Sequence, residues 1–511
     1  MTDSSAVAAN PALVTNANWP WRIGLVALLT ALADWLFFRH YVGISFALFI
    51  VALGIAVLLA NRTGASGRER ILYTGILVAA LLPSLEDVNV MSVLIAVFGI
   101  GCFALGATGA LKGGAIERFM TVGWLLVSGP LQFMRDLPLL RQWASQRGAP
   151  ASLSALKGWV LPLGLGAVFV ALFAAANPVI AQWLAQWGTG DTLRQLNPVR
   201  LMFWCFIVIA VWGLVSVSSR FALPRFDEPA KAPSPDTDMN PVFSEAANVR
   251  PPDVDLGSIF TDTAIMRSLV LFNLLFAVQT VMDVHYLWRG AALPDGMTYA
   301  TYAHRGAYPL IVTALLAAAF VLAAMRPGSD TERSPPMRAL VFLWVGQNVL
   351  LVVSAIMRLN LYVETYLLTY WRVAAFIWMA IVAVGLILVV ARIVLYRSNA
   401  WLIAANLVVL ALTIYVCSFV NFASLVARYN VTHAPAIAGR PIDLAYVLSL
   451  GGEVIPALDR HFAASSIVDV RYFRDYRDAL VRRHATVNAD WRAWTFRGWR
   501  LTRYLENAKQ P

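Results

Sequence analysis

Long apolar runs separated by short polar turns extend over most of the chain, from about residue 21 to residue 421. A helix needs about 20 mostly apolar residues to cross the hydrocarbon core of a bilayer. Each run is expected to be helical, because hydrocarbon offers no partner for a free backbone N–H or C=O group. The pattern predicts an all-α, polytopic transmembrane helix bundle of about 11 spans with a helical C-terminal tail. The runs lie near residues 21–38, 41–60, 71–86, 88–111, 158–177, 200–221, 265–287, 305–325, 338–358, 370–396 and 401–421.

The runs form two groups divided by a segment of different composition. Residues 223–262 combine seven prolines with Asp, Ser and Ala, which predicts a disordered cytoplasmic linker. The linker separates an N-terminal six-span membrane region, 1–222, from a C-terminal five-span membrane region, 263–430. Residues 431–511 lack a run long enough to span, and their short amphipathic stretches predict a helical extramembrane tail.

Residues 115–147 interrupt the first group. The apolar stretch 119–134 is broken by Gly129-Pro130 and flanked by arginines, so it is short for a span. We expect helices at 115–147 that lie on the cytoplasmic interface. If residues 119–134 crossed instead, the orientation of every later span would reverse.

The first run has some features of a secretory signal peptide. Arg22, the apolar stretch after it and the small residues Ala31-Leu32-Ala33 fit that pattern. The leader before Arg22 is long and has no basic residue, which favours a retained helix.

The composition agrees with a membrane protein. The chain is 59% hydrophobic and 14% charged, whereas a soluble domain has about 25% charged residues. Three cysteines cannot build a disulfide framework. The net charge of +11 is not accompanied by a phosphate loop, zinc-ligand spacing or RNA-binding pattern. We therefore expect no nucleic-acid partner and no cofactor.

The distribution of basic residues predicts the orientation. With the N-terminus in the cytoplasm, the cytoplasmic segments hold 20 Lys and Arg and the outer loops hold 7. Cytoplasmic loops carry the excess of Lys and Arg in most membrane proteins. The bias predicts a multi-pass protein of a bacterial inner membrane with its C-terminal tail in the periplasm.

Polar residues gather at the outer ends of spans in the second group. They follow span 7, precede span 8, join spans 9 and 10, and follow span 11, so this topology places them on one face. Interfacial anchoring by Tyr, Trp and Arg explains such residues without a ligand. The alternative is a charge cluster that binds a lipid headgroup, a glycan or a protein. The candidate binding residues are Asp283, His285, Tyr286, Trp288, Tyr302, His304, Arg305, Arg358, Tyr362, Glu364, Arg372 and Arg428.

Two further interpretations concern acids. Asp283, His285, His304 and Glu364 are ligand types that suit zinc, but their spacing is not diagnostic and we predict no metal site. Asp34 in span 1 is an intramembrane acid. It lies near the outer end of the helix beside Arg39, or it serves a proton or cation relay.

The tail ends in a run that interleaves Trp and Arg, from Asp490 to Arg500. Three interpretations fit: the run packs on the outer face of the bundle, lies on the membrane surface, or binds a partner. Polar residues inside the spans, such as Asn273 and Gln347, are expected to form hydrogen bonds between helices.

Several long motifs of the second half resemble a known family. They are the stretch from Val281 to Tyr308 with YAHRGAY at 302–308, WVGQN at 344–348, Arg358 with Tyr362, Tyr366 and Thr369, RSNAW at 397–401, and ARYNV at 427–431. These motifs are similar to those of a bacterial polytopic membrane family known only as a domain of unknown function, over roughly residues 260–460. The resemblance implies an inner-membrane location, no assigned activity and no catalytic residue.

The sequence favours a non-enzymatic envelope component. Its expected partners are membrane lipids and a periplasmic or membrane protein. A transporter or lipid flippase is the alternative and predicts a polar path through the bundle. A membrane-embedded enzyme is the second alternative and predicts a close pair of carboxylates, such as Asp283 and Glu364.

Overall fold

The computed structural model describes residues 19–61, 64–146, 198–217, 262–288, 334–433, 443–463 and 470–508, whose regular structure is helical throughout. The chain divides into two compact units. Unit 1 comprises residues 1–224 and 481–511, and unit 2 comprises residues 225–480. The predicted spans 158–177 and 305–325, and the predicted linker up to residue 261, lie outside the described residues.

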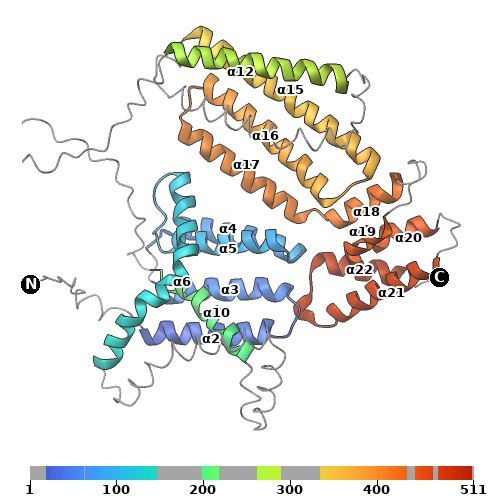
Figure 1. Ribbon diagram of the computed structural model, residues 1–511. Helices are drawn as coiled ribbons and strands as arrows, with labels where there is room; N and C mark the ends of the chain where they lie inside the picture. Colours follow the sequence, from blue (N-terminus) through green and yellow to red (C-terminus); the bar gives the residue numbers. More distant parts are fainter. Residues whose placement is uncertain are drawn as a thin grey trace, which may run out of the picture. The chain divides into compact units, whose positions relative to one another are not determined.

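Unit 1 is a bundle of antiparallel hairpins with an additional long helix (Figure 1). Its helices are α2 (Trp19–Phe37), α3 (Ile44–Ala60), α4 (Gly67–Glu86), α5 (Val90–Ala107), α6 (Ala115–Gln146), α10 (Pro198–Val215), η4 (Trp491–Ala493) and α22 (Phe496–Asn507). Local sequence sets several helix starts. Ser66 and Glu69 form a reciprocal capping box at α4, and Asn89 caps the first amide groups of α5.

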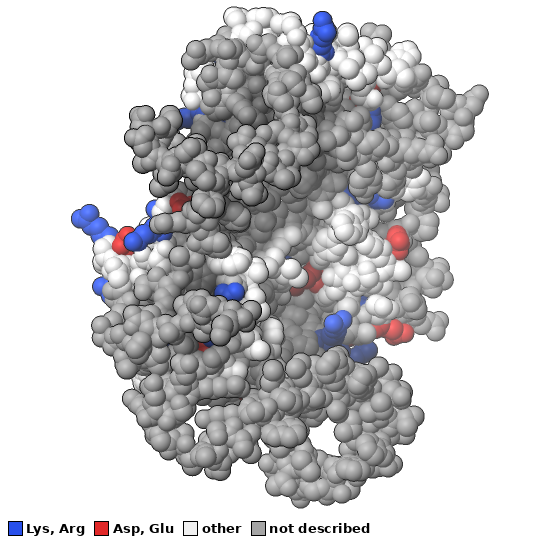
Figure 2. All heavy atoms as spheres, turned by 60° about the vertical axis from the view of Figure 1, so that its left-hand side comes forward, with Lys and Arg blue, Asp and Glu red and all other residues white. Residues whose placement is uncertain are grey.

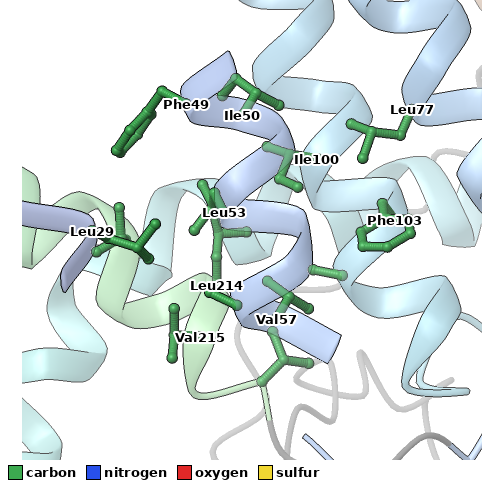
Figure 3. Packing of buried hydrophobic residues seen from close by; sticks show 14 of the residues in the cluster. Leu29, Phe49, Ile50, Leu53, Val57, Leu77, Ile100, Phe103, Leu214 and Val215 are labelled. Atoms are coloured by element: carbon green, nitrogen blue, oxygen red, sulfur yellow. The ribbon is translucent and has the colours of Figure 1, made fainter. Parts of the chain in front are cut away.

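The core of unit 1 is an apolar cluster in which α3 is central. Leu53 and Val57 of α3 pack among side chains of α2, α4, α5 and α10 (Figure 3). Within this core, glycines of α5 permit a close approach to α4. A Cβ atom on Gly99 would lie 2.4 Å from the Cβ of Ala80, and one on Gly106 would lie 2.3 Å from the Tyr73 ring. Small residues at such contacts are typical of helices that pack within lipid.

The region predicted as interfacial helices is a single helix, α6, of 32 residues. It packs on α5 and α10, with Phe119 against Phe98 and Phe133 against Trp212. The indole of Trp212 donates to Asp136 at 3.0 Å. In Figure 1, α6 runs steeply across the direction of α2 to α5. Its position at the membrane interface stays a prediction.

Unit 2 contains a row of long helices, each packed on the next in sequence, followed by a group of short helices (Figure 1). The elements are α12 (Asp262–Asp283), η1 (Val284–Trp288), α15 (Pro335–Tyr366), α16 (Tyr370–Val394), α17 (Asn399–Phe419), α18 (Phe422–His433), α19 (Leu444–Ser449), η3 (Gly452–Val454) and α20 (Ile455–Ala463). Helix α21 (Val470–Val487) crosses the division between the units.

Side-chain amides join the first helices of unit 2. Asn273 Nδ2 of α12 donates to the Leu340 carbonyl of α15 at 3.0 Å. Gln347 Nε2 of α15 donates back to the Asn273 carbonyl at 3.1 Å. The predicted interhelical role of these two residues is confirmed.

Six described helices are long and apolar enough to cross a membrane: α2, α5, α12, α15, α16 and α17. Helices α3 and α10 are apolar but shorter. Helix α4 corresponds to the run 71–86 but begins with charged residues. Figure 2 shows that the described surface in that view is mostly uncharged, with charged side chains in small separate groups. These features fit an integral membrane protein, and the count of about 11 spans is not confirmed.

Charged residues bracket the apolar stretches of α15 and α16. Helix α15 has 32 residues, about 48 Å of helix, which exceeds the core of a bilayer, about 30 Å. Arg338 and Arg358 are separated by about 30 Å along its axis, as are Arg372 and Arg392 along α16. Arg358 and Arg372 therefore lie toward the same end of this antiparallel pair.

Candidate functional site

The C-terminal end of α12 is joined to α15 by a buried ion pair. The carboxylate of Asp283 accepts hydrogen bonds from the guanidinium of Arg358 and, at 2.9 Å, from Nε2 of Gln279. Asp283 is 1% exposed and Arg358 is 8% exposed. Two charges taken from water at this depth require each other, because the loss of one leaves the other unpaired at a cost of several kcal/mol.

The π-turn η1 continues from this pair and returns to α15. Trp288 Nε1 donates to the hydroxyl of Ser354 at 3.2 Å. Ser354 lies one helical turn before Arg358, and both are buried on the same side of α15. Two adjacent contacts therefore hold the irregular turn, which is the kind of element that often occurs at functional sites.

A second arginine, Arg372, closes the end of α15. Its Nη1 donates to the carbonyl of Tyr366 at 2.6 Å and to that of Leu367. Its guanidinium carbon lies 4.4 Å from the centre of the Tyr362 ring and 5.9 Å from that of Tyr366. The last carbonyls of a helix lack intrahelical donors, and a cation there is also favoured by the helix dipole.

Helices α18 and α19 hold the turn between α15 and α16. The buried side chain of Asn430 accepts from Leu368 N at 2.7 Å and donates to Leu368 O at 3.0 Å. Tyr370 N donates to the hydroxyl of Tyr446 at 3.0 Å. Leu367 has φ of 63°, a left-handed conformation that is strained for a leucine. These contacts offset that strain and fix the path of the turn.

Four described candidate residues on this end of unit 2 are exposed: His285, Trp288, Glu364 and Arg428. Glu364 accepts from Asn360 Nδ2 at 2.6 Å. The ring of Tyr429 stacks on His433 with centroids 4.0 Å apart. Burial, and then the charge of Glu364, raises the pKa of Tyr429, so its phenol stays neutral. The exposed residues His285, Trp288, Glu364 and Arg428, together with the exposed Tyr366, form what we call the unit-2 end surface.

The structure places the predicted residues that it describes in separate contacts and not in one charge cluster. Asp283 pairs with Arg358, Arg372 binds carbonyls and tyrosine rings, and Glu364 is exposed. Tyr302, His304, Arg305 and the side chain of Tyr286 lie outside the described residues.

Sequence reasoning did not identify the contribution of Ser354 or Tyr446, or the partners of Asn430 and Gln279; Gln279 donates to Asp283 of its own helix rather than to another helix. The sequence around Asn430 could have indicated that this side chain is buried and bonded. Ala423, Val426, Ala427 and Asn430 are spaced as one buried helical stripe, and a polar residue in such a stripe needs a partner.

Asp34 in unit 1 has a partner that the sequence did not suggest. Arg200 of α10, rather than the neighbouring Arg39, donates to it, with Nε 2.8 Å from Oδ1. Trp204 Nε1 donates to the same oxygen at 2.8 Å. The guanidinium of Arg200 also lies over the Phe38 and Trp204 rings. Asp34 thus joins α2 to α10.

No group of three or more His, Cys, Asp or Glu that could hold a metal ion occurs among the described residues. His304, one of the four ligand types considered, lies outside them.

The end of the chain packs on unit 1 where α2 turns into α3. Ile44 N donates to Trp494 O at 2.8 Å, and Arg492 Nε donates to Trp35 O at 3.1 Å. A Cβ on Gly43 would lie 2.3 Å from the backbone of Ala493, so this contact requires glycine.

Ion pairs extend this contact. Arg497 binds Glu86 and Asp87 at the end of α4, and Arg500 binds Glu86. His40 Nδ1 lies 2.6 Å from Asp490 Oδ2. The backbone N–H of Arg492, aided by His40 and the Arg492 side chain, lowers the pKa of Asp490.

His484 joins α21 to α22 as a neutral ring. Asn488 Nδ2 donates to its Nδ1 at 3.1 Å, which leaves the proton on Nε2, 2.9 Å from Thr502 Oγ1. Burial lowers the pKa of His484 from its ordinary value of 6.5. The unfolded state therefore binds the proton more readily, and this contribution to stability is complete above pH 6.5 and is lost as the pH falls below it.

Comparison with known proteins identifies one match. A family model described as a domain of unknown function (DUF4153) matches residues 73–461. No curated protein matches the chain, and no solved structure does. The matched range extends further toward the N-terminus than the motifs of the second half, since it begins in α4.

Asp283→Asn and Arg358→Gln are each expected to lower the free energy of unfolding by about 3–5 kcal/mol, because each leaves a buried charge alone. The double variant is expected to lose less than the sum of the two. Unfolding in mixed detergent micelles, titrated with a denaturing detergent, measures the cycle. Additive losses would show that the two side chains do not stabilise one another.

The thermal midpoint of the detergent-solubilised protein is expected to fall from pH 7 to pH 5, since His484 must charge in a half-buried position. In His484→Gln, which keeps hydrogen-bonding capacity but does not titrate, the midpoint is expected to fall less. Parallel pH profiles for the two proteins would contradict a role for His484.

Proposed function

The chain belongs to the family of the domain of unknown function DUF4153, and on this premise we propose that it is a non-enzymatic inner-membrane component. In this proposal it binds a lipid, glycan or protein partner of the envelope at its periplasmic face. The binding region is the unit-2 end surface.

The arrangement around Asp283 and Arg372 supports recognition. Two buried charges, Asp283 and Arg358, neutralise each other, and Arg372 holds the turn between α15 and α16. The groups left exposed are an acid, a base and an imidazole: Glu364, Arg428 and His285. A rigid support beneath exposed groups of both signs suits a polar ligand.

The enzyme alternative has less support from the same contacts. A retaining glycoside hydrolase uses two carboxyl groups about 5 Å apart, both available to the substrate. Asp283 is buried against Arg358, whereas Glu364 is exposed and accepts from Asn360. The two carboxylates have different partners and different exposure.

The transport alternative also has less support, because the intramembrane acids are paired. A proton or cation relay needs an acid that can change its charge or its ligand. Asp34 is held by Arg200 and Trp204, and Asp283 is held by Arg358. A relay through either acid would first have to break an ion pair.

The proposed orientation follows from the excess of basic residues in the predicted cytoplasmic segments. We expect a reporter fused after residue 240 to give a cytoplasmic signal and one fused after residue 505 to give a periplasmic signal. Paired alkaline phosphatase and fluorescent protein fusions measure this. A cytoplasmic signal at residue 505 would contradict the odd number of spans.

A photo-crosslinking amino acid at Glu364 or Arg428 is expected to capture one dominant species in intact cells, because both positions lie on the proposed surface. Mass spectrometry of the adduct distinguishes lipid, glycan and protein. The matched control is Arg397, an exposed arginine at the turn between α16 and α17. The same adducts in the same yield at all three positions would contradict a specific binding surface.

A further inference from the structure

Helix α22 has two distinct faces. Arg497, Gly498, Leu501 and Leu505 are buried. Phe496 and Trp499 on the other side are 41% and 39% exposed. The buried side is explained by packing and by the ion pairs with α4. The exposed side requires another explanation, because large aromatic rings are seldom left in water as a group.

The exposed side alternates arginines with aromatic rings. Phe496 and Trp499 stack with centroids 5.5 Å apart. The guanidinium of Arg500 lies 4.9 Å from the centre of the Phe496 ring, and that of Arg503 lies 5.1 Å from a Trp499 ring centre. An aromatic ring with an arginine guanidinium stacked on it suits the headgroup region of a bilayer. That region accommodates both the apolar ring and the charged group.

The position of this surface agrees with that environment. The segment from η4 to α22 contacts the end of α2, the start of α3 and the end of α4. Helix α2 is long and apolar enough to cross a membrane. Residues that pack on the end of such a helix lie near the level of the headgroups. Trp35 of α2 and Trp491, with ring centroids 5.8 Å apart, continue the aromatic surface.

An open depression of about 410 Å³ lies beside it, between the α2–α3 turn and the tail. Arg39, His40, Tyr41 and Trp491 contribute to its lining. Arg39 is exposed and has φ of 64°. The acid in the depression, Asp490, is bound by His40 and Arg492. An anion entering the depression would therefore meet the charge of Arg39 with the nearest carboxylate already paired.

The charge of the tail favours an anionic occupant. Residues 489–511 contain five Lys and Arg but two acids. The acids of α4 at the contact, Glu86 and Asp87, are bound by Arg497 and Arg500. Each basic residue near an anionic bilayer surface contributes about 1 kcal/mol to attraction.

We propose that the α2–α3 turn, η4 and α22 form a binding surface for anionic phospholipid headgroups of the membrane that the helices of unit 1 cross. Arg39 and Arg503 contact lipid phosphates, and Phe496, Trp499 and Trp491 insert among the headgroups. The membrane thereby holds α22 on the bundle. This surface is separate from the unit-2 end surface, and its function does not depend on which compartment contains the tail.

The test uses the full chain in nanodiscs of phosphatidylcholine, with and without about 30% phosphatidylglycerol, and follows amide exchange in residues 489–507. Exchange is expected to slow about tenfold in the anionic discs, because two arginines engage lipid phosphates. Arg39→Gln with Arg503→Gln is expected to abolish this difference. The charge-matched control is Arg482→Gln with Arg483→Gln, which alters two exposed arginines of α21 and is expected to preserve it.

Each variant is compared between its own two discs, so a change in basal stability does not affect the result. Arg39→Lys with Arg503→Lys is expected to retain the difference, because the charge remains. Equal exchange of the wild type in both discs would overturn the proposal, as would equal losses in the two glutamine variants. Inorganic phosphate that slowed exchange equally in pure phosphatidylcholine discs would also overturn it, in favour of a soluble phosphate ligand.

Discussion

Charge in an apolar helix bundle needs a partner, and the arrangement of both units depends on how that need is met. Asp34 and Asp283 lie at the ends of apolar helices, and each is bound by an arginine of another helix. An isolated charge at membrane depth costs several kcal/mol. Each pair therefore fixes which helices are neighbours and in what register: α2 with α10, and α12 with α15.

At the end of unit 2, the charged residues that stabilise the fold differ from those that are exposed for binding. Arginines that could serve a ligand, Arg358 and Arg372, are used to satisfy Asp283 and the last carbonyls of α15. Arg428 and Glu364 lie at the surface. A loss of function on mutation of Arg358 or Arg372 should thus be interpreted first as a loss of stability and only then as a loss of binding.

Much of the architecture could be predicted from sequence because its signal is local. Apolar runs of membrane length predicted the described long helices. The polar residues at the ends of these runs include the pair Asp283 and Arg358, which do meet, whereas their role in a binding surface stays a prediction. Two side-chain pairings were not predicted from the sequence, for different reasons. The partner of Asp34 is 166 residues away and is not the adjacent Arg39. Glu364 and Arg372 lie on either side of the turn between α15 and α16, but Arg372 donates to backbone carbonyls instead of binding Glu364. The order of side chains in the sequence does not reveal a partner in the backbone.

The contact between His40 and Asp490 joins positions 450 residues apart. Residues 1–72 and 462–511 both lie outside the range matched by the family model, and this contact brings parts of them together. During translation, α2 and α3 emerge from the ribosome long before η4 and α22 exist to cover their turn. Unit 1 can become complete only after the whole of unit 2 has been synthesised, so the residues of the α2–α3 turn and those of η4 must be compatible although they are made far apart in time.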